Sequence, residues 1–167
     1  MTTPTTVAWL PEKLAEADFD DLNALEAAAY AIFQNDWTDF PSFRGEDVRV
    51  HRRPHIANGD RWNTYWHAVS EGSPEHLRTS PIPERLVRVP WCRPMVENES
   101  DAVVKVWANV RGRDQHICIW FDRINYIVIL KQCRNHVLLK TAYCPKSRRK
   151  QQLHREYAAW KKTGRAL

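Results

Sequence analysis

Apolar residues recur at three- and four-residue steps between positions 11 and 34, the spacing of one face of a helix. Pro11 suits a first helical turn, and acidic residues gather early in the segment, where a helix N-terminus favours negative charge. The pattern predicts an N-terminal helix whose acidic face is exposed to solvent or turned toward the basic C-terminus. Its apolar face comprises Leu14, Phe19, Leu22, Leu25, Ala29, Ile32 and Phe33.

Two short segments that follow, 48–52 and 64–70, alternate in polarity or carry β-branched and aromatic residues. This composition predicts two short strands. Between residues 81 and 98 several prolines interrupt the chain, and they exclude a long helix because proline lacks a backbone N–H. One or two short helical turns are expected there.

After residue 101 the pattern changes to alternation and then to continuous apolar runs, around 104–108, 117–121, 126–130 and 137–139. The links are short, and residues 111–114 have the composition of a hairpin turn, which predicts an antiparallel meander. Ser147 is expected to cap a last, basic helix that runs to about Lys161. The predicted fold class is α+β: an N-terminal helix, a four-stranded antiparallel meander sheet and a basic C-terminal helix. The predicted units are an acidic helical segment over 1–43 and an α+β domain over 44–167.

Charge divides unevenly over the 167 residues, whose formal net charge is +5. Residues 1–40 carry −7 and residues 145–167 carry +7. A basic half of this kind is typical of a nucleic-acid footprint, although a solvated helix face explains a basic tail equally well. No apolar run is long enough to span a bilayer, and residues 1–6 lack the basic end and apolar stretch of a secretory leader. A cytoplasmic protein with no membrane partner is therefore expected.

Metal-ligand patterns are absent from the sequence. The four cysteines form no CxxC pair, and Glu97, Glu99 and Asp101 have no histidine at helical spacing. Neither an HExxH motif nor a glycine-rich phosphate loop occurs. We expect no metal site and no cofactor, with the cysteines present as free thiols.

Of the seven histidines, His67 is the best candidate for chemistry, because bulky neighbours in the predicted strand would hold its ring. The alternative is a strand histidine satisfied by backbone partners. Thr141 and Tyr143 end the last predicted strand beside a helix start, a natural anion site, or they are simply strand-forming residues. The arginines around Trp91 could hold phosphate, or they cover apolar surface with their stems. They are Arg85, Arg88 and Arg93.

The ordered set of segments resembles the phage- and prophage-encoded nuclease-like proteins of the barnase–EndoU–colicin–RelE-like superfamily. It comprises Trp66-His67, the arginine–tryptophan segment 85–94 with Glu97-Asn98, the strand ending in Leu138-Leu139-Lys140-Thr141-Ala142-Tyr143, and the basic helix after it. The resemblance covers about residues 44–160. It implies a helical N-terminal part followed by a four-stranded antiparallel sheet, and cleavage of RNA without a metal. Such nucleases are often toxins, which implies an inhibitor protein as a second partner besides RNA.

The resemblance assigns roles that fit metal-free RNA cleavage, in which the substrate's own 2′-hydroxyl attacks the phosphorus. This chemistry needs a base, an acid and cations. His67 is assigned as base or acid, Arg88 as a cation that stabilises the transition state, and Thr141 and Tyr143 as hydroxyls that position phosphate. The residues assigned to substrate binding are Arg85, Trp91, Arg93, Lys140, Lys146, Arg148 and Arg149.

Two other functions remain open at this point. A non-catalytic nucleic-acid-binding module would bind through Arg148, Arg149 and Lys150, with affinity that depends on salt. A phage or host interaction protein would instead act through the acidic segment 1–40.

Overall fold

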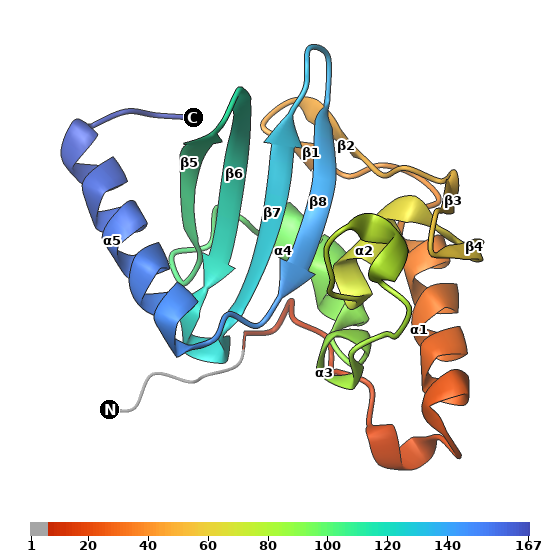
Figure 1. Cartoon of the computed structure of the whole chain (residues 1–167). Coiled ribbons are helices and arrows are strands. Elements are labelled where there is room, and N and C mark those ends of the chain that lie inside the picture. The colour runs from red at the N-terminus through yellow and green to blue at the C-terminus, as the bar shows by residue number, and fades with distance from the viewer. Residues whose placement is uncertain (1–6) are drawn as a thin grey trace.

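The computed structural model describes residues 7–167, so the first six residues, on which the prediction about a secretory leader bears, lie outside it. The fold is α+β: helices near the N-terminus pack on a curled sheet, and a long helix ends the chain (Figure 1). Along residues 7–167, no helix combines the length and the apolar character needed to cross a membrane.

The sheet has six strands in the order β1-β2-β8-β7-β6-β5. Strands β5 to β8 form the predicted antiparallel meander, but β2 pairs in parallel with β8 and β1 extends the sheet beyond β2. The prediction of a four-stranded antiparallel sheet is therefore wrong, because a segment from early in the chain occupies the outer edge of β8. The strands are β1 (Ser42–Phe43), β2 (Glu46–Arg49), β5 (Lys105–Arg111), β6 (Asp114–Phe121), β7 (Tyr126–Gln132) and β8 (Val137–Tyr143).

Strand β8 contains one extra residue relative to β7. Ile129 pairs with Thr141 and Leu130 pairs with Leu139, so Lys140 has no partner across the ladder. A bulge of this kind bends the strand and redirects a side chain. The parallel pairing with β2 covers only Val137 and Leu138, so the later part of β8 has no strand on its outer side.

Helix α1 (Leu22–Asp36) begins later than the periodicity predicts. The Asp21 carboxylate accepts a hydrogen bond from the Ala24 backbone N–H at 2.8 Å and caps the helix there, while the preceding segment forms only the 3₁₀ turn Glu16–Asp18. Leu25, Ala29 and Phe33 are buried, as predicted for the apolar face.

Residues 64–70, predicted as a strand, form helix α2 (Asn63–Val69) instead, so that prediction is wrong. Three consecutive residues, Thr64, Tyr65 and Trp66, are buried, which a strand with one solvent face does not allow. The Tyr65 hydroxyl lies 2.7 Å from Glu26 Oε2, and the Trp66 indole donates to the Arg78 carbonyl at 2.6 Å. Tertiary contacts thus override the local strand preference of these residues.

The remaining elements before the meander are short. The expected helical turns between residues 81 and 98 are present as α3 (Pro83–Leu86), the 3₁₀ turn Val89–Trp91 and α4 (Cys92–Glu97). Strands β3 (Pro54–His55) and β4 (Asn58–Trp62) form a separate two-stranded hairpin. Two further 3₁₀ turns are η2 (Glu75–Leu77) and η4 (Asp122–Ile124).

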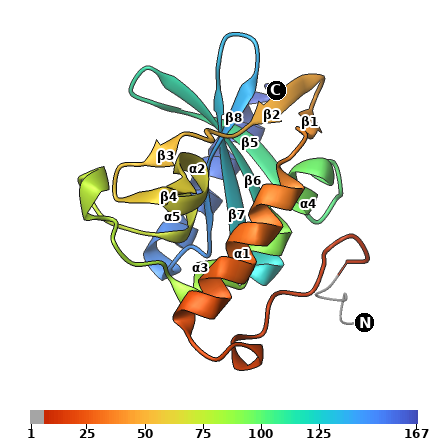
Figure 2. The same ribbon diagram turned by 90° about the vertical axis from the view of Figure 1, so that its right-hand side faces the viewer.

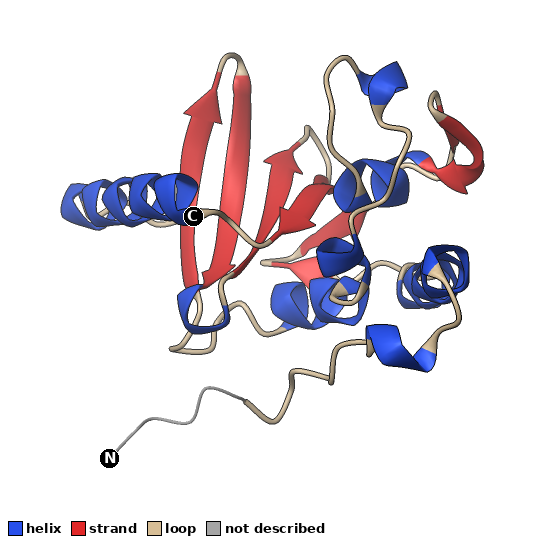
Figure 3. Ribbon diagram, turned by 60° about the horizontal axis from the view of Figure 1, so that its bottom comes forward, coloured by secondary structure: helices blue, strands red, loops and turns tan. Residues whose placement is uncertain are grey.

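Helix α5 (Ser147–Thr163) packs on the opposite face of the sheet from α1, as the view in Figure 2 shows, so the acidic helix is not turned toward the basic one. The predicted packing face is confirmed: Leu153 is fully buried, with Tyr157 and Trp160 beside it. The prediction that Ser147 caps this helix is wrong. Lys146 is the N-cap residue, and no side chain forms a capping hydrogen bond there. Figure 3 shows this helix running crosswise to the neighbouring strands.

Truncation of Leu153 tests how α5 is attached. Leu153→Ala leaves a cavity between α5 and the sheet, so we expect it to lower the free energy of unfolding by about 2–5 kcal/mol in urea denaturation. Gln151→Ala, at an exposed position of the same helix, serves as the control and should leave stability nearly unchanged. A Leu153 variant as stable as the control would show that α5 is not held by this contact.

Candidate functional site

A cavity of about 290 Å³ opens between helix α2, strands β7 and β8, and the segment that leads from β2 into β3. Its walls are largely polar, and most of its charged groups are basic. The lining residues are His51, Arg53, Asn63, Thr64, His67, Glu75, Lys131, Leu138, Leu139 and Lys140.

Basic groups predominate in the cavity lining, where Arg53, Lys131 and Lys140 stand with one carboxylate, Glu75, while Lys131 also pairs with Asp114 at 3.2 Å. Burial and the nearby Arg53 lower the pKa of His51, and Lys131 and Lys140 contribute in the same direction. A histidine whose pKa is lowered by neighbouring cations indicates a place where an anion is favoured.

His67 projects into this cavity from α2 and is about three-quarters buried. Its Nδ1 atom lies 2.8 Å from Glu75 Oε1, whereas Nε2 has no hydrogen-bond partner within residues 7–167. Burial, together with the charges of Arg78 and Lys140, lowers the pKa of His67 below its ordinary value of 6.5, although Glu75 opposes the shift. At neutral pH the ring is therefore mostly uncharged, with one nitrogen free to accept a proton.

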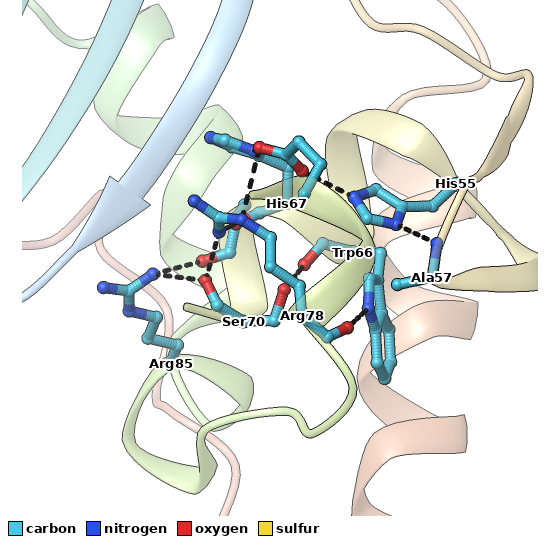
Figure 4. A network of polar contacts seen from close by, with 9 residues as sticks. His55, Ala57, Trp66, His67, Ser70, Arg78 and Arg85 are labelled. Carbon is cyan, nitrogen blue, oxygen red and sulfur yellow. Dashed lines mark hydrogen bonds and ion pairs between the residues drawn. The ribbon is translucent and has the colours of Figure 1, made fainter. Parts of the chain in front are cut away.

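Glu75 links His67 to two other groups, His55 and Arg78, which are labelled beside His67 in Figure 4. Its Oε2 atom lies 2.8 Å from Nε2 of His55, and its Oε1 atom lies 3.2 Å from Nε of Arg78. Burial raises the pKa of Glu75, but the hydrogen bond from His55 and the charges of His67 and Arg78 outweigh it, so the pKa is lowered. The carboxylate is therefore ionised at neutral pH.

Two of the sequence-predicted residues, His67 and Lys140, meet in the cavity. The bulge at Lys140 explains its place, because a regular β8 would not carry Lys140 and Leu139 into the same cavity wall. Thr141 follows directly and pairs with Ile129, which packs under α5. Thr141 does not line the cavity.

A second cluster of predicted residues forms around Tyr143. The Arg149 Nε–H donates to the Tyr143 hydroxyl at 3.3 Å, and the Arg85 guanidinium lies 5.3 Å from the centre of the Tyr143 ring. Arg85 also donates to the carbonyls of Ala68 and Ser70. Arg85 and Arg149 are thus engaged with protein groups.

The other predicted residues are not brought to the cavity. Arg88 donates to the Glu84 carbonyl and lies over the Trp91 ring, and the Trp91 indole donates to the Pro11 carbonyl. Arg93 forms ion pairs with Asp39 and Glu97. Lys146 and Arg148 are exposed at the start of α5.

Sequence reasoning missed several residues of the site: His51, Arg53, Glu75 and Lys131. The density of histidine and arginine in residues 51–55 is a usable signal, although such a composition also fits a basic, flexible segment. Nothing in the local sequence distinguishes Glu75 from other exposed acids. Among residues 7–167, no group of three or more His, Cys, Asp or Glu side chains is arranged to hold a metal ion.

The geometry above is the basis on which a function can be assigned. Comparisons of the chain with protein-family models, with curated proteins and with solved structures gave no match.

Proposed function

We propose that this protein is an endoribonuclease of the toxin type that cleaves RNA without a metal ion, leaving a 2′,3′-cyclic phosphate. The single observation that carries the proposal is the state of His67: Nδ1 is held by Glu75, and Nε2 is unpartnered within the described residues, in a cavity lined by three cations. A neutral, oriented imidazole beside a basic cavity is what attack by a 2′-hydroxyl requires.

In the proposed reaction, His67 Nε2 takes the proton of the 2′-hydroxyl while O2′ forms a bond to phosphorus. The bond from phosphorus to O5′ then breaks, and O5′ takes a proton from a second group. His51 supplies it, because it lines the same cavity and the bound phosphate favours its charged form. The products are a 2′,3′-cyclic phosphate and a free 5′-hydroxyl.

The cations of the cavity act on the phosphate. Charge grows on the non-bridging oxygens as the fifth bond forms, and fixed positive groups in a partly enclosed site stabilise it. Lys140, Lys131 and Arg53 have this role in the proposal. They take the place of Arg88. The resemblance assigns Arg88 to transition-state stabilisation, but Arg88 does not line the cavity.

A specific observation favours a second candidate, a nucleic-acid-binding module without catalysis. Lys146 and Arg148 are exposed at the start of α5, outside the cavity, where they are free to contact a phosphate backbone. That function predicts salt-dependent RNA binding that survives loss of His67 and produces no cleavage.

A cell that produces such a nuclease needs protection from it. We therefore include an inhibitor protein among the proposed partners. The cavity's charge indicates that the inhibitor would cover it with acidic groups.

Substitution of His67 tests the reaction directly. With total RNA and a chelator present, we expect His67→Ala to lower the cleavage rate by about 100-fold or more, the usual contribution of a general base. The readout is the yield of fragments ending in 2′,3′-cyclic phosphate. His76→Ala is the matched control, since His76 is exposed and does not line the cavity. Undiminished cleavage by a folded His67→Ala protein would remove His67 from the mechanism.

The pH profile follows from the lowered pKa of His67. The base must be unprotonated, so activity is lost as the pH falls through its pKa, and the acidic limb of kcat/KM should have its midpoint below 6.5. Burial, followed by the charges of Arg78 and Lys140, keeps this pKa low, and Glu75 limits the shift. A midpoint at or above pH 7 would contradict the assignment.

Removal of cavity lysines tests phosphate binding apart from chemistry. In the His67→Ala background, Lys140→Ala and Lys131→Ala should each weaken binding to single-stranded RNA and reduce the slope of log affinity against log salt by about 0.7. Lys13→Ala removes the same charge from the exposed N-terminal segment, away from the cavity, and is the control. Equal effects of all three changes would show that RNA does not enter the cavity.

A further inference from the structure

His55 is the buried histidine of the molecule's polar network. Its side chain is fully buried in β3, although imidazole carries two polar nitrogens. Both are paired: Nδ1 lies 2.9 Å from the backbone N–H of Ala57, and Nε2 lies 2.8 Å from Glu75 Oε2. A buried polar group is retained at such a position only when its hydrogen bonds are satisfied.

These two contacts determine where the proton of His55 resides. A backbone N–H only donates, so Nδ1 of His55 must accept the hydrogen bond from Ala57 with its lone pair. In the neutral ring the proton is then on Nε2, which donates it to Glu75. The ring is a fixed donor toward the carboxylate.

The same donor and acceptor rules apply to the contact between Glu75 and His67. An ionised carboxylate only accepts hydrogen bonds, so Nδ1 of His67, 2.8 Å from Oε1, must carry a proton. The basic lone pair of His67 is consequently on Nε2, the nitrogen without a partner among the described residues. Glu75 determines the tautomer of His67 as well as its orientation.

Glu75 needs an anchor to do this. Its side chain is about half exposed, which leaves it room to rotate, and its ion pair with Arg78 holds only Oε1. His55 binds the second carboxylate oxygen from a buried position and restrains that rotation. Arg78 itself is held through hydrogen bonds to the His67 and Ser70 carbonyls (Figure 4).

We propose that His55 is a positioning residue, whose buried Nε2–H holds the Glu75 carboxylate so that Glu75 keeps His67 in its Nδ1–H tautomer, with Nε2 as the basic nitrogen. The catalytic consequence rests on the proposed ribonuclease function. The tautomer assignment does not depend on that function. A misassigned tautomer would place a proton on the nitrogen that must accept one, as it does when the orienting carboxylate of a hydrolase triad is replaced by an amide.

Matched substitutions at His55 separate positioning from packing. His55→Gln keeps an N–H near the place of Nε2, whereas His55→Asn is too short to reach Glu75. We expect His55→Asn to lower the single-turnover cleavage rate about tenfold or more and to change the affinity for RNA less than twofold, and His55→Gln to restore much of the rate. Glu75→Gln should lower the cleavage rate at least as much as His55→Asn. An amide has only one acceptor oxygen, so it cannot accept hydrogen bonds from both histidines.

The direct readout is ¹⁵N NMR of the histidine rings near neutral pH. In the unaltered protein, His55 should be in the Nε2–H form and His67 in the Nδ1–H form. In His55→Asn, the His67 signals should move toward a mixture of both tautomers. If His55→Asn fails to fold, the tautomers of the unaltered chain still test the hydrogen-bond assignments on which the inference rests.

The outcomes are distinguishable. An Nε2–H tautomer of His67 in the unaltered protein overturns the inference, as does a folded His55→Asn protein with unchanged His67 signals and an unchanged rate. If the unaltered protein does not cleave RNA but the His67 signals respond to His55→Asn, the positioning role stands and the proposed function fails. If cleavage occurs and depends on His67 while His55→Asn leaves both readouts unchanged, the function stands and the positioning role fails.

Discussion

Strand β8 is the element on which the rest of the structure depends, because its two edges have different neighbours. One edge pairs with β7 along the whole strand, while the other pairs with β2 only at Val137 and Leu138. Helix α2 packs against β8 and brings His67 beside it. Had β2 continued along β8, this wall of the cavity would be a strand, and His67 would have no place in it.

The cavity shows how a polar network is maintained at the edge of a hydrophobic core. Glu75 is one carboxylate among several cations and histidines, and each of its oxygens has a donor. Burial and nearby cations lower the pKa of His51 and His67, which favours their neutral forms before a phosphate binds. Positive field and neutral imidazole are thus produced by the same arrangement, and RNA cleavage by a 2′-hydroxyl requires both.

Much of the secondary structure is predictable from the sequence, and the candidate site only in part. The meander and the basic last helix follow from local periodicity, and two of the residues that the sequence singles out, His67 and Lys140, line the cavity. Other residues that the sequence singles out lie outside the cavity, for a shared reason. Arg88 and Arg93 are close to Trp91 in sequence, but each is held by acidic or carbonyl groups from other segments, which no local pattern reveals.

The sequence by itself determined the alternation that makes β5 to β8, the amphipathic face of α5 and the separation of acidic and basic halves, because these are local patterns read along one chain. Only the tertiary structure decided that residues 63–69 are helical, that β2 joins the sheet in parallel, and that the bulge brings Lys140 into the cavity. It also decided that Glu75 meets His55 and His67. These contacts join residues distant in sequence, and their energies arise only when the core packs.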